Sequence, residues 1–397
     1  MPVDFDSLPK YQEVRVPKHS MVLWLLAFVI VEGAGVLLGL MLWPADLPAQ
    51  TPWFWIRILG APLLLYIVIF FANRFLAFHR LLNTLADNTA IDAKRDTMHK
   101  EASIPLAVID SAWRFSSTDA ENTLSVALKP SGSPDEKSLR ALSRPDRQYY
   151  PGNRQDEKER HAALFEWLLI DLLTPLMPAL QHASRVGVSL FIGSLLPPKV
   201  VEDILAKALG TLKMRPSFSI EVCTEGSLLP VDKWLDQRES GHMRLAIAAQ
   251  LCGAISGDMR IDQSEAGAAL LFCPISPNQQ QEAHLAHVHR PATGGADDAE
   301  ALFTNALRWG NCRDDKVETV WLGGLAKPLE EAFRGLENPA VPANEIALSN
   351  TIGDAGVAAP WLALALSCAA ANESGKAQLI LDERDGDLVA LICRKQV

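Results

Sequence analysis

The chain has 397 residues, with 37 Lys and Arg against 47 Asp and Glu, so its formal net charge is −10. A nucleic-acid-binding protein is expected to show a basic excess or a basic patch, and neither is present, so no nucleic-acid partner is expected. The six cysteines are scattered without C-x-x-C or paired spacing, which is typical of reduced core residues in a cytoplasmic domain. No cofactor is expected.

Two long apolar runs stand near the beginning of the chain, over 21–43 and 53–72. Each has about 20 residues or slightly more, which is the length that a helix needs to cross roughly 30 Å of hydrocarbon. A cleaved signal peptide fits poorly, because the first run is too long for its apolar region and a second run follows closely. We therefore expect a hairpin of two transmembrane helices in a lipid bilayer, followed by a globular domain.

The charges beside the two runs predict their orientation. The segment 1–20 carries basic residues, the turn over 44–51 carries neither Lys nor Arg, and Arg74 and Arg80 follow the second run. Positive charge near membrane segments stays on the cytoplasmic side. Both termini are therefore expected in the cytoplasm.

An acidic residue, Glu32, interrupts the first run together with Gly33 and Gly35. A carboxylate in the middle of a bilayer is costly and is expected to face protein or to be neutral. One interpretation is that Glu32 packs against the second helix of the hairpin. The alternative is a site of oligomerisation or coupling.

After the second run, the segment 75–102 is expected to be a juxtamembrane helix that continues the span. The apolar run 104–109 predicts a buried strand, and Pro105 favours an edge position for it. The run 123–128 is a further strand candidate. The polar stretch 129–160, with Pro, Gly, Asp and Arg throughout, predicts a long loop or cap.

From His161 onward, amphipathic helical segments alternate with apolar runs that are typical of buried strands. Helices are expected over 161–180, 198–209, from 230, and over 298–307, 327–336 and 358–371. Strands are expected over 186–192, 217–222, 245–251, 266–273, 286–289, 317–322, 345–348, 377–381 and 387–393, the last two joined by a turn at Asp385-Gly386. Such alternation indicates an α/β domain with largely parallel sheets that are covered on both faces.

Three segments resemble a known family. The sequence from Ser349 to Ala359, SNTIGDAGVAA, is similar to the late motif of β-ketoacyl synthases, in which a Ser-x-Ile-Gly-His turn opens a buried helix. The sequence from Val317 to Gly324 resembles the strand and turn that carry the first catalytic His of that family, and Glu265 to Leu271 resembles the strand that closes its first half. The likeness runs from about Ile104 to the C-terminus.

This resemblance implies a thiolase-like fold, in which two similar α/β halves pack as five layers, α-β-α-β-α. The first half would span 103–275 and the second 276–397. Members of the family usually dimerise through the sheet of the first half, so the resemblance also implies a homodimer.

The motifs depart from the family where its chemistry takes place. Asp354 stands at the late His position, and the earlier His position falls on Trp321 or Leu322, just before Gly323. In the family, His or Asn at these positions holds the acyl carbonyl, whereas an ionised acid would repel a developing oxyanion. We therefore expect a relic pocket, formed by Trp321, Leu322, Gly323 and Asp354, without ketosynthase chemistry.

Cys223 follows a predicted strand and lies near the place of the family's nucleophilic Cys. A helix N-terminus would favour its thiolate, but the neighbouring Glu225 disfavours it, and the His partners are absent. The interpretations are a buried cysteine at a strand end or a nucleophile. If the protein is an enzyme, its candidate catalytic residues are Cys223, Asp354 and Glu225.

Two further clusters each allow two interpretations. His284, His287 and His289 form an H-x2-H-x-H pattern, which is either a solvated strand end or part of a zinc site; no metal is expected. Trp234, among charged residues, and Trp361, at the start of an apolar helix, are either core residues or anchors for a partner.

The overall pattern also resembles that of uncharacterised bacterial membrane proteins associated with type VI secretion effector clusters, through the WFW start of the second span, IPLAV, VDKWLD and DAGVAAPWLALAL. This resemblance implies an inner-membrane adaptor or scaffold without catalytic residues, whose partner is an effector or a secretion component. The alternative is a divergent acyltransferase or thioesterase that uses Cys223 with Asp354 or Glu225. A third reading is a sensor that binds an acyl chain in the relic pocket.

Overall fold

The computed structural model divides into two compact units, Asp4–Met98 and His99–Val397, which we call the hairpin unit and the globular unit. It describes residues 8–14, 20–44, 48, 51–129, 140–144, 146–214, 216–223, 225–237, 242–275, 284–312, 317–325, 327–335 and 344–395. Part of the predicted cytoplasmic segment 1–20 and part of the turn 44–51 therefore lie outside the described residues.

The hairpin unit consists of two antiparallel helical stretches. The first is α1 (Met21–Met41), whose N-cap Ser20 accepts a hydrogen bond from the backbone N–H of Leu23. The second stretch is formed by α2 (Pro52–Trp55), the π-helix η2 (Ile56–Gly60) and α3 (Ala61–Ala102). Pro62 has no N–H to donate to the preceding turn, which explains why the widened π-turn lies just before it. α3 runs without a break through 75–102, as predicted.

Glycines allow the two stretches of the hairpin to approach closely. A Cβ atom at Gly35 would overlap with the ring of Pro62, and one at Gly39 would lie 3.0 Å from Cγ1 of Ile58. Small residues four positions apart are a common device for packing membrane helices. Gly35 and Gly39 therefore serve the packing of the two helical stretches of one hairpin against each other.

Aromatic side chains hold the other end of the hairpin. Trp24 packs edge-on against Phe70, with ring centroids 4.9 Å apart. The Tyr66 hydroxyl donates a hydrogen bond of 3.1 Å to the backbone carbonyl of Trp24. These contacts tie the beginning of α1 to α3.

Three helical stretches in the described part of the chain could cross a membrane by length and composition: α1, Pro52–Ala102 and α5 (Arg154–Leu180). The third was not expected, and it belongs to the globular unit. Its Leu164, Leu168 and Leu172 are buried in a protein core. The apolar character of α5 is therefore used for packing against the sheet.

The globular unit repeats one strand order twice. The strands of its first half are β1 (Leu106–Arg114), β2 (Arg185–Gly193), β3 (Ser217–Cys223), β4 (His242–Gln250) and β5 (Ala266–Pro274). Their order in the sheet is β3-β2-β4-β5-β1; β2, β3 and β4 are parallel, and β5 is antiparallel to both of its neighbours.

The second half has the same order and directions. Its strands are β6 (Ala286–Val288), β8 (Thr319–Leu322), β9 (Glu345–Ala347), β10 (Gln378–Arg384) and β11 (Asp387–Arg394). They are ordered β9-β8-β10-β11-β6, with β11 antiparallel to both neighbours. β1 pairs with β6, so the halves share one 11-stranded sheet, to which β7 (Ala292–Gly294) adds by pairing with β11. Two similar halves are therefore present. The prediction of largely parallel sheets is wrong, because β5 and β11 are antiparallel to their neighbours and β1 is antiparallel to β6.

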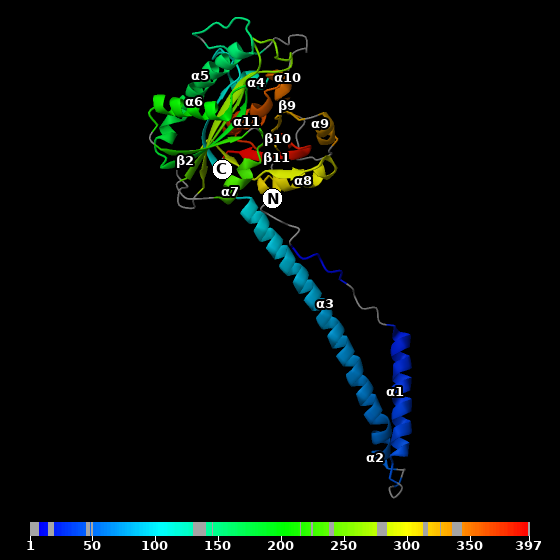
Figure 1. Ribbon diagram of the computed structural model, residues 1–397. Helices are drawn as coiled ribbons and strands as arrows, with labels where there is room; N and C mark the ends of the chain where they lie inside the picture. Colours follow the sequence, from blue (N-terminus) through cyan, green and yellow to red (C-terminus); the bar gives the residue numbers. More distant parts are fainter. Residues whose placement is uncertain are drawn as a thin grey trace. The chain divides into compact units, whose positions relative to one another are not determined.

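Helices cover both faces of this sheet, as Figure 1 shows for α11 in the middle and for α5 and α6 side by side on the outside. The helices are α6 (Pro198–Thr211), α7 (Pro230–Asp236), α8 (Ala299–Trp309), α9 (Lys327–Arg334) and α11 (Ala359–Ser374). In β4, Ala246 and Ala248 belong to a central core with α7 and α11, whereas Leu245 and Ile247 belong to an outer core with α5 and α6. The strands are therefore continuous apolar runs in the sequence, because both faces of the sheet are buried.

Three predictions about local structure are wrong. The run 123–128 forms a single helical turn, α4 (Leu124–Ala127), because a short apolar run does not by itself distinguish a strand from a helix. β1 is not at an edge, since it pairs on both sides; Pro105 precedes its first residue and removes no donor from the ladder. The expected loop 129–160 ends at Asn153, whose side chain caps α5.

The cap of α5 is a reciprocal capping box. The Asn153 side chain accepts from backbone N–H groups of the first turn, and the Asp156 side chain accepts from the N–H of Asn153. Within the expected loop, residues 130–139 and 145 lie outside the described residues.

The remaining short elements complete the chain. They are η3 (Ala296–Asp298), α10 (Leu348–Thr351) and η4 (Gly356–Ala358). The predicted turn between β10 and β11 is confirmed: Asp385 and Gly386 have φ angles of 54° and 86°, as a tight hairpin requires.

Candidate functional site

The segments that resemble ketosynthase motifs surround the central layer of the globular unit. Cys223 is the last residue of β3 and Glu225 lies in the turn after it. The end of β8 contains Trp321 and Leu322, and the turn before η4 contains Asp354. Whether these side chains can cooperate depends on where each one points.

Asp354 lies at the surface, where its side chain contacts Arg260 and the backbone of its own loop. Its carboxylate accepts a hydrogen bond of 3.2 Å from Arg260 and one of 2.9 Å from the backbone N–H of Gly356. Its backbone N–H donates to the carbonyl of Asp262, and its carbonyl accepts from Ser264. With 38% of its side chain exposed, Asp354 acts as an anchor for this loop.

Trp321 fills the core instead of lining an open space. Its side chain is fully buried, and its indole N–H donates to Oε1 of Gln378 at 3.1 Å. The adjoining Gly323 leaves no room for a larger residue, because a Cβ there would lie 3.0 Å from the Pro360 backbone and 3.1 Å from the Leu381 carbonyl. Leu322 is also buried.

Cys223 is partly buried and packs against the central core. Burial, followed by the charge of Glu221, raises the pKa of its thiol. Glu225 lies largely in solvent and forms an ion pair of 3.0 Å with Arg384. A thiol held in its protonated form is a poor nucleophile.

The three expected catalytic or relic side chains do not act on one another. Within the described ranges, no hydrogen bond or ion pair joins any two of Cys223, Asp354 and Trp321. The turn after β3 and the turn at η4 instead approach through their backbones, because a Cβ at Gly226 would overlap with Val357. The two turns are therefore in close contact at Gly226 and Val357.

Gln250, at the end of β4, closes the same region. Its side-chain carbonyl accepts a hydrogen bond of 3.1 Å from the backbone N–H of Val357. It lies so close to Gly193 and Gly356 that a Cβ at either glycine would overlap with it. Nothing in the sequence pattern pointed to this residue, since a Gln at the end of an apolar strand has many uses.

Trp234 and Trp361 are core residues. Trp234 is 6% exposed and Trp361 is fully buried, so neither presents a surface to a partner. Trp361 stacks on Phe191 with ring centroids 4.6 Å apart, and Trp234 packs against Trp361 at 5.8 Å and Phe272 at 5.4 Å. This aromatic cluster fills the centre of the unit.

Asp382, in β10, is a buried carboxyl that sequence reasoning missed. It accepts hydrogen bonds from the backbone N–H groups of Leu228, at 2.9 Å, and Glu383, at 2.7 Å. Burial nevertheless raises the pKa of Asp382 to about 7. The signal that could have revealed it is an acidic residue within an otherwise apolar strand. Its bond to Leu228 joins the second half of the fold to the turn before α7.

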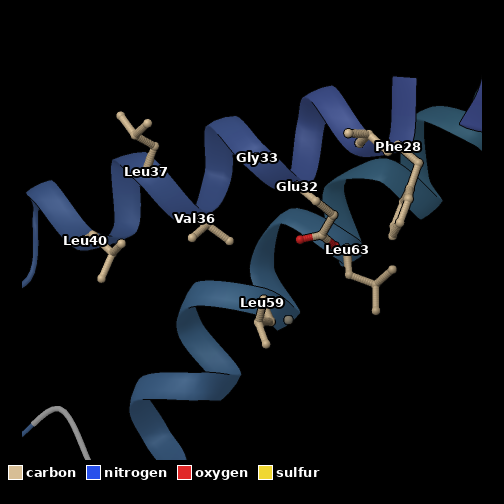
Figure 2. Close-up of a pocket in the computed structure, with 10 residues that line it drawn as sticks. Phe28, Glu32, Gly33, Val36, Leu37, Leu40, Leu59 and Leu63 are labelled. Atoms are coloured by element: carbon tan, nitrogen blue, oxygen red, sulfur yellow. The ribbon is translucent and has the colours of Figure 1, made fainter. Parts of the chain in front are cut away.

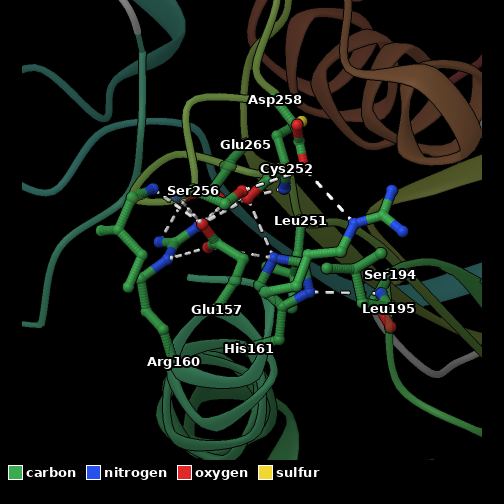
Figure 3. Close-up of polar contacts among 12 residues, drawn as sticks. Glu157, Arg160, His161, Ser194, Leu195, Leu251, Cys252, Ser256, Asp258 and Glu265 are labelled. Atoms are coloured by element: carbon green, nitrogen blue, oxygen red, sulfur yellow. Dashed lines mark hydrogen bonds and ion pairs between the residues drawn. The ribbon is translucent and has the colours of Figure 1, made fainter. Parts of the chain in front are cut away.

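A buried ionic cluster occupies the outer side of the first half (Figure 3). Arg160 of α5 contacts both Glu157, through a bond of 2.6 Å, and Glu265. The Glu157 carboxylate also accepts from the backbone N–H groups of Ile255 and Ser256, each at 2.7 Å. Burial alone would raise the pKa of Glu157, but these bonds, above all that from Arg160, lower it.

Glu265 connects further loops to the same cluster. It accepts hydrogen bonds of 2.8 Å from the backbone N–H groups of Cys252 and Leu142. His161 donates from Nε2 to the Cys252 carbonyl and accepts at Nδ1 from the Leu195 N–H, so its two bonds define one neutral tautomer. Since the charges are paired and bonded, the cluster is suited to holding loops together.

The histidine pattern is not a solvated strand end. Burial lowers the pKa of His287 and of His289 to about 4, and the ring of His289 bonds to the Ser103 carbonyl. Among the described residues, no group of three or more His, Cys, Asp or Glu side chains could hold a metal ion. His289 is therefore a neutral core group, whereas His284 and His287 are half-buried.

Comparisons with known proteins address the fold. No family model matches the sequence, and no curated protein matches it. A structure described as "type II PKS acyl-carrier protein in complex with its ketosynthase bound to the hexaketide" matches with a TM-score of 0.53 and 12% identity, covering 74% of this chain and 99% of that chain. "The ishigamide ketosynthase/chain length factor" matches with a TM-score of 0.49 and 15% identity, covering 74% of this chain and 100% of that chain.

Identities this low concern the fold alone. Neither structure is a protein of type VI secretion, so that resemblance stays a prediction. The first match and the strand order that occurs twice in the globular unit agree with each other. This chain therefore has a mixed α/β fold that is thiolase-like.

Proposed function

We propose that this protein is a membrane-anchored, non-catalytic scaffold whose cytoplasmic domain is a degenerate thiolase-like unit. The observation that carries the proposal is the close contact between the turns that carry the ketosynthase-like motifs. Gly226 meets Val357 there, and Gln250 bonds across the same gap. A reacting acyl group would need that space.

The side chains around this space also favour a scaffold. Asp354 is engaged by Arg260, and Trp321 by Gln378. The raised pKa of Cys223 leaves its thiol protonated near neutral pH. No histidine follows His289 in the chain, so neither the end of β8 nor the turn before η4 offers one to assist an acyl transfer.

The membrane anchor is proposed from the surface of the hairpin unit. α1 has no buried residue, and Leu23 and Leu37 are 67% and 61% exposed. Contiguous apolar surface of this kind is expected to face lipid. With basic residues before α1 and after the second apolar run, we propose a bacterial inner-membrane location with both termini in the cytoplasm.

A scaffold needs a partner, and we propose an effector or a secretion component. Affinity capture of the full-length chain from its native membrane, followed by mass spectrometry, tests this partner class. Stoichiometric recovery of such a protein would support the adaptor role. Recovery of acyl carrier protein, or of this chain alone, would contradict it.

The sharper experiment asks whether the protein accepts an acyl group. Full-length protein in detergent is incubated with acetyl-, malonyl- and octanoyl-CoA, beside a competent ketosynthase, and analysed by intact mass. We expect no adduct on this chain. An adduct that is lost in Cys223→Ser but kept in Cys252→Ser would contradict the proposal and favour an acyltransferase or thioesterase.

A further inference from the structure

The hairpin unit carries an open groove that is apolar except for one acid. The groove has a volume of about 820 Å³ and runs along α1 and the η2–α3 stretch (Figure 2). Its lining residues are Phe28, Val29, Glu32, Gly33, Val36, Leu37, Leu40, Leu59, Gly60 and Leu63. The side chain of Glu32 reaches from α1 towards Leu63.

Glu32 lacks a partner in this groove. Its Oε2 atom is buried and has no hydrogen-bond partner. An ionised carboxylate in hydrocarbon is costly, and a neutral carboxyl there still has one donor and one acceptor to satisfy. The hairpin is therefore incomplete at Glu32.

The rest of the hairpin is already engaged. Gly35 and Gly39 are used by Pro62 and Ile58, and the Tyr66 hydroxyl is bound to a carbonyl of α1. By contrast, nothing lies within 4 Å of the place where a Cβ of Gly33 would stand. Gly33 thus leaves room for another backbone next to Glu32.

We propose that a second copy of this chain seats its α1 in this groove, and that each Glu32 side chain then turns out of its buried position so that the two carboxyls hydrogen-bond to each other. The inference rests on the proposed membrane anchor. Two copies inserted in the same orientation have Glu32 at the same depth, and a two-fold axis along the membrane normal brings the two side chains face to face. A protonated carboxyl of one copy donates its O–H to the carboxyl of the other, so each satisfies its neighbour without another polar residue.

Self-association of the full-length chain in phosphatidylcholine vesicles tests this arrangement. Donor- and acceptor-labelled copies are diluted with lipid, and energy transfer gives the dissociation constant. We expect Glu32→Leu to raise that constant about 5- to 30-fold, the range for one interhelical polar pair in a membrane. Glu32→Gln, which keeps a donor and an acceptor, should remain within about threefold of the wild type.

Leu38→Ala is the matched control, because Leu38 lies on the same helix, is 57% exposed and does not line the groove. It should associate as the wild type does. A monomeric wild type, or a Glu32→Leu variant that associates equally well, would overturn the inference. A basic partner protein whose binding is lost in Glu32→Leu while the purified wild type is monomeric would overturn it too.

Extraction at alkaline pH separates this inference from the anchor on which it rests. Wild type and variants should all stay in the vesicles. Release of the wild type would contradict the membrane anchor itself, whereas a retained but monomeric wild type would contradict only the pairing at Glu32.

Discussion

The two halves of the globular unit share one strand order but contribute unequally to its centre. The first half places the 7-residue α7 there and keeps its long helices, α5 and α6, outside. The second half supplies the 16-residue α11, which is buried on all sides. The centre is therefore built on one apolar helix, whereas the outer side of the first half is held by buried charges.

Removing an aromatic ring from the central helix should have the largest effect. Trp361→Ala should lower the free energy of unfolding by about 3–5 kcal/mol, because it leaves a cavity where Trp361 stacks on Phe191. Denaturant unfolding of the full-length protein in detergent measures the loss. Ile261→Ala, at a position that is 67% exposed, is the control and should stay within about 0.5 kcal/mol of wild type. A small loss for Trp361→Ala would mean that the centre is loosely packed.

A substitution in the buried ionic cluster of the first half should destabilise the protein for a different reason. Arg160→Met leaves Glu157 and Glu265 buried without their cation, which should cost about 3 kcal/mol near neutral pH. The loss should shrink as pH falls, because the freed carboxylates become protonated. Arg154→Met, on the same helix, is the control, since its contact with Asp258 is exposed. Equal losses for the two variants would contradict a structural role for the cluster.

Asp382 links the two halves, and its effect should depend on pH. A folded-state pKa of about 7, above the usual 3.9, means that the folded protein binds the extra proton, so this stability is present at low pH and is lost as pH rises through 7. The stability advantage of wild type over Asp382→Asn should therefore fall by about 2 kcal/mol between pH 5 and 7.

Unfolding midpoints of both proteins at several pH values measure this difference. His287 and His289 act in the opposite direction, since their lowered pKa values cost stability as pH falls from 6.5 to 4. Both histidines are present in the wild type and in Asp382→Asn, so their contributions cancel in the difference between the two proteins. Parallel pH profiles would show that Asp382 is ionised throughout.

The smallest effect is expected at the exposed contact between the turn after β3 and β10. Arg384→Ala removes the ion pair with Glu225, whose side chain is 66% exposed, and should cost less than about 0.5 kcal/mol. The same unfolding assay at low and high salt measures it. A loss above about 1 kcal/mol would mean that this pair, more than Asp382, holds the halves together.

The secondary structure could be predicted from the sequence where burial imposes a simple pattern of apolar residues. The strands β2, β4 and β5 could be predicted because both faces of each are covered, and α6 because its apolar residues follow one stripe. The beginning of α5 was missed, since its first turns contain charged residues that look like a loop until Glu157 and Arg160 are seen to be buried.

The candidate site was predictable only in part. The Asp at position 354 could be recognised as a departure from a family motif, but its partner Arg260 is remote in the chain. The close approach of Gly226 to Val357 depends on how two loops from different halves meet. Local patterns contain no information on such distances.

The central place of β1 also bears on how the chain is synthesised. Its partners β5 and β6 follow about 150 residues or more behind it, so at roughly 5–20 residues per second β1 leaves the ribosome some 10–30 s before it can pair. During that time an apolar strand such as LAVIDSAWR has unpaired backbone groups on both sides. Nascent β1 is the segment of this protein for which a chaperone would matter most.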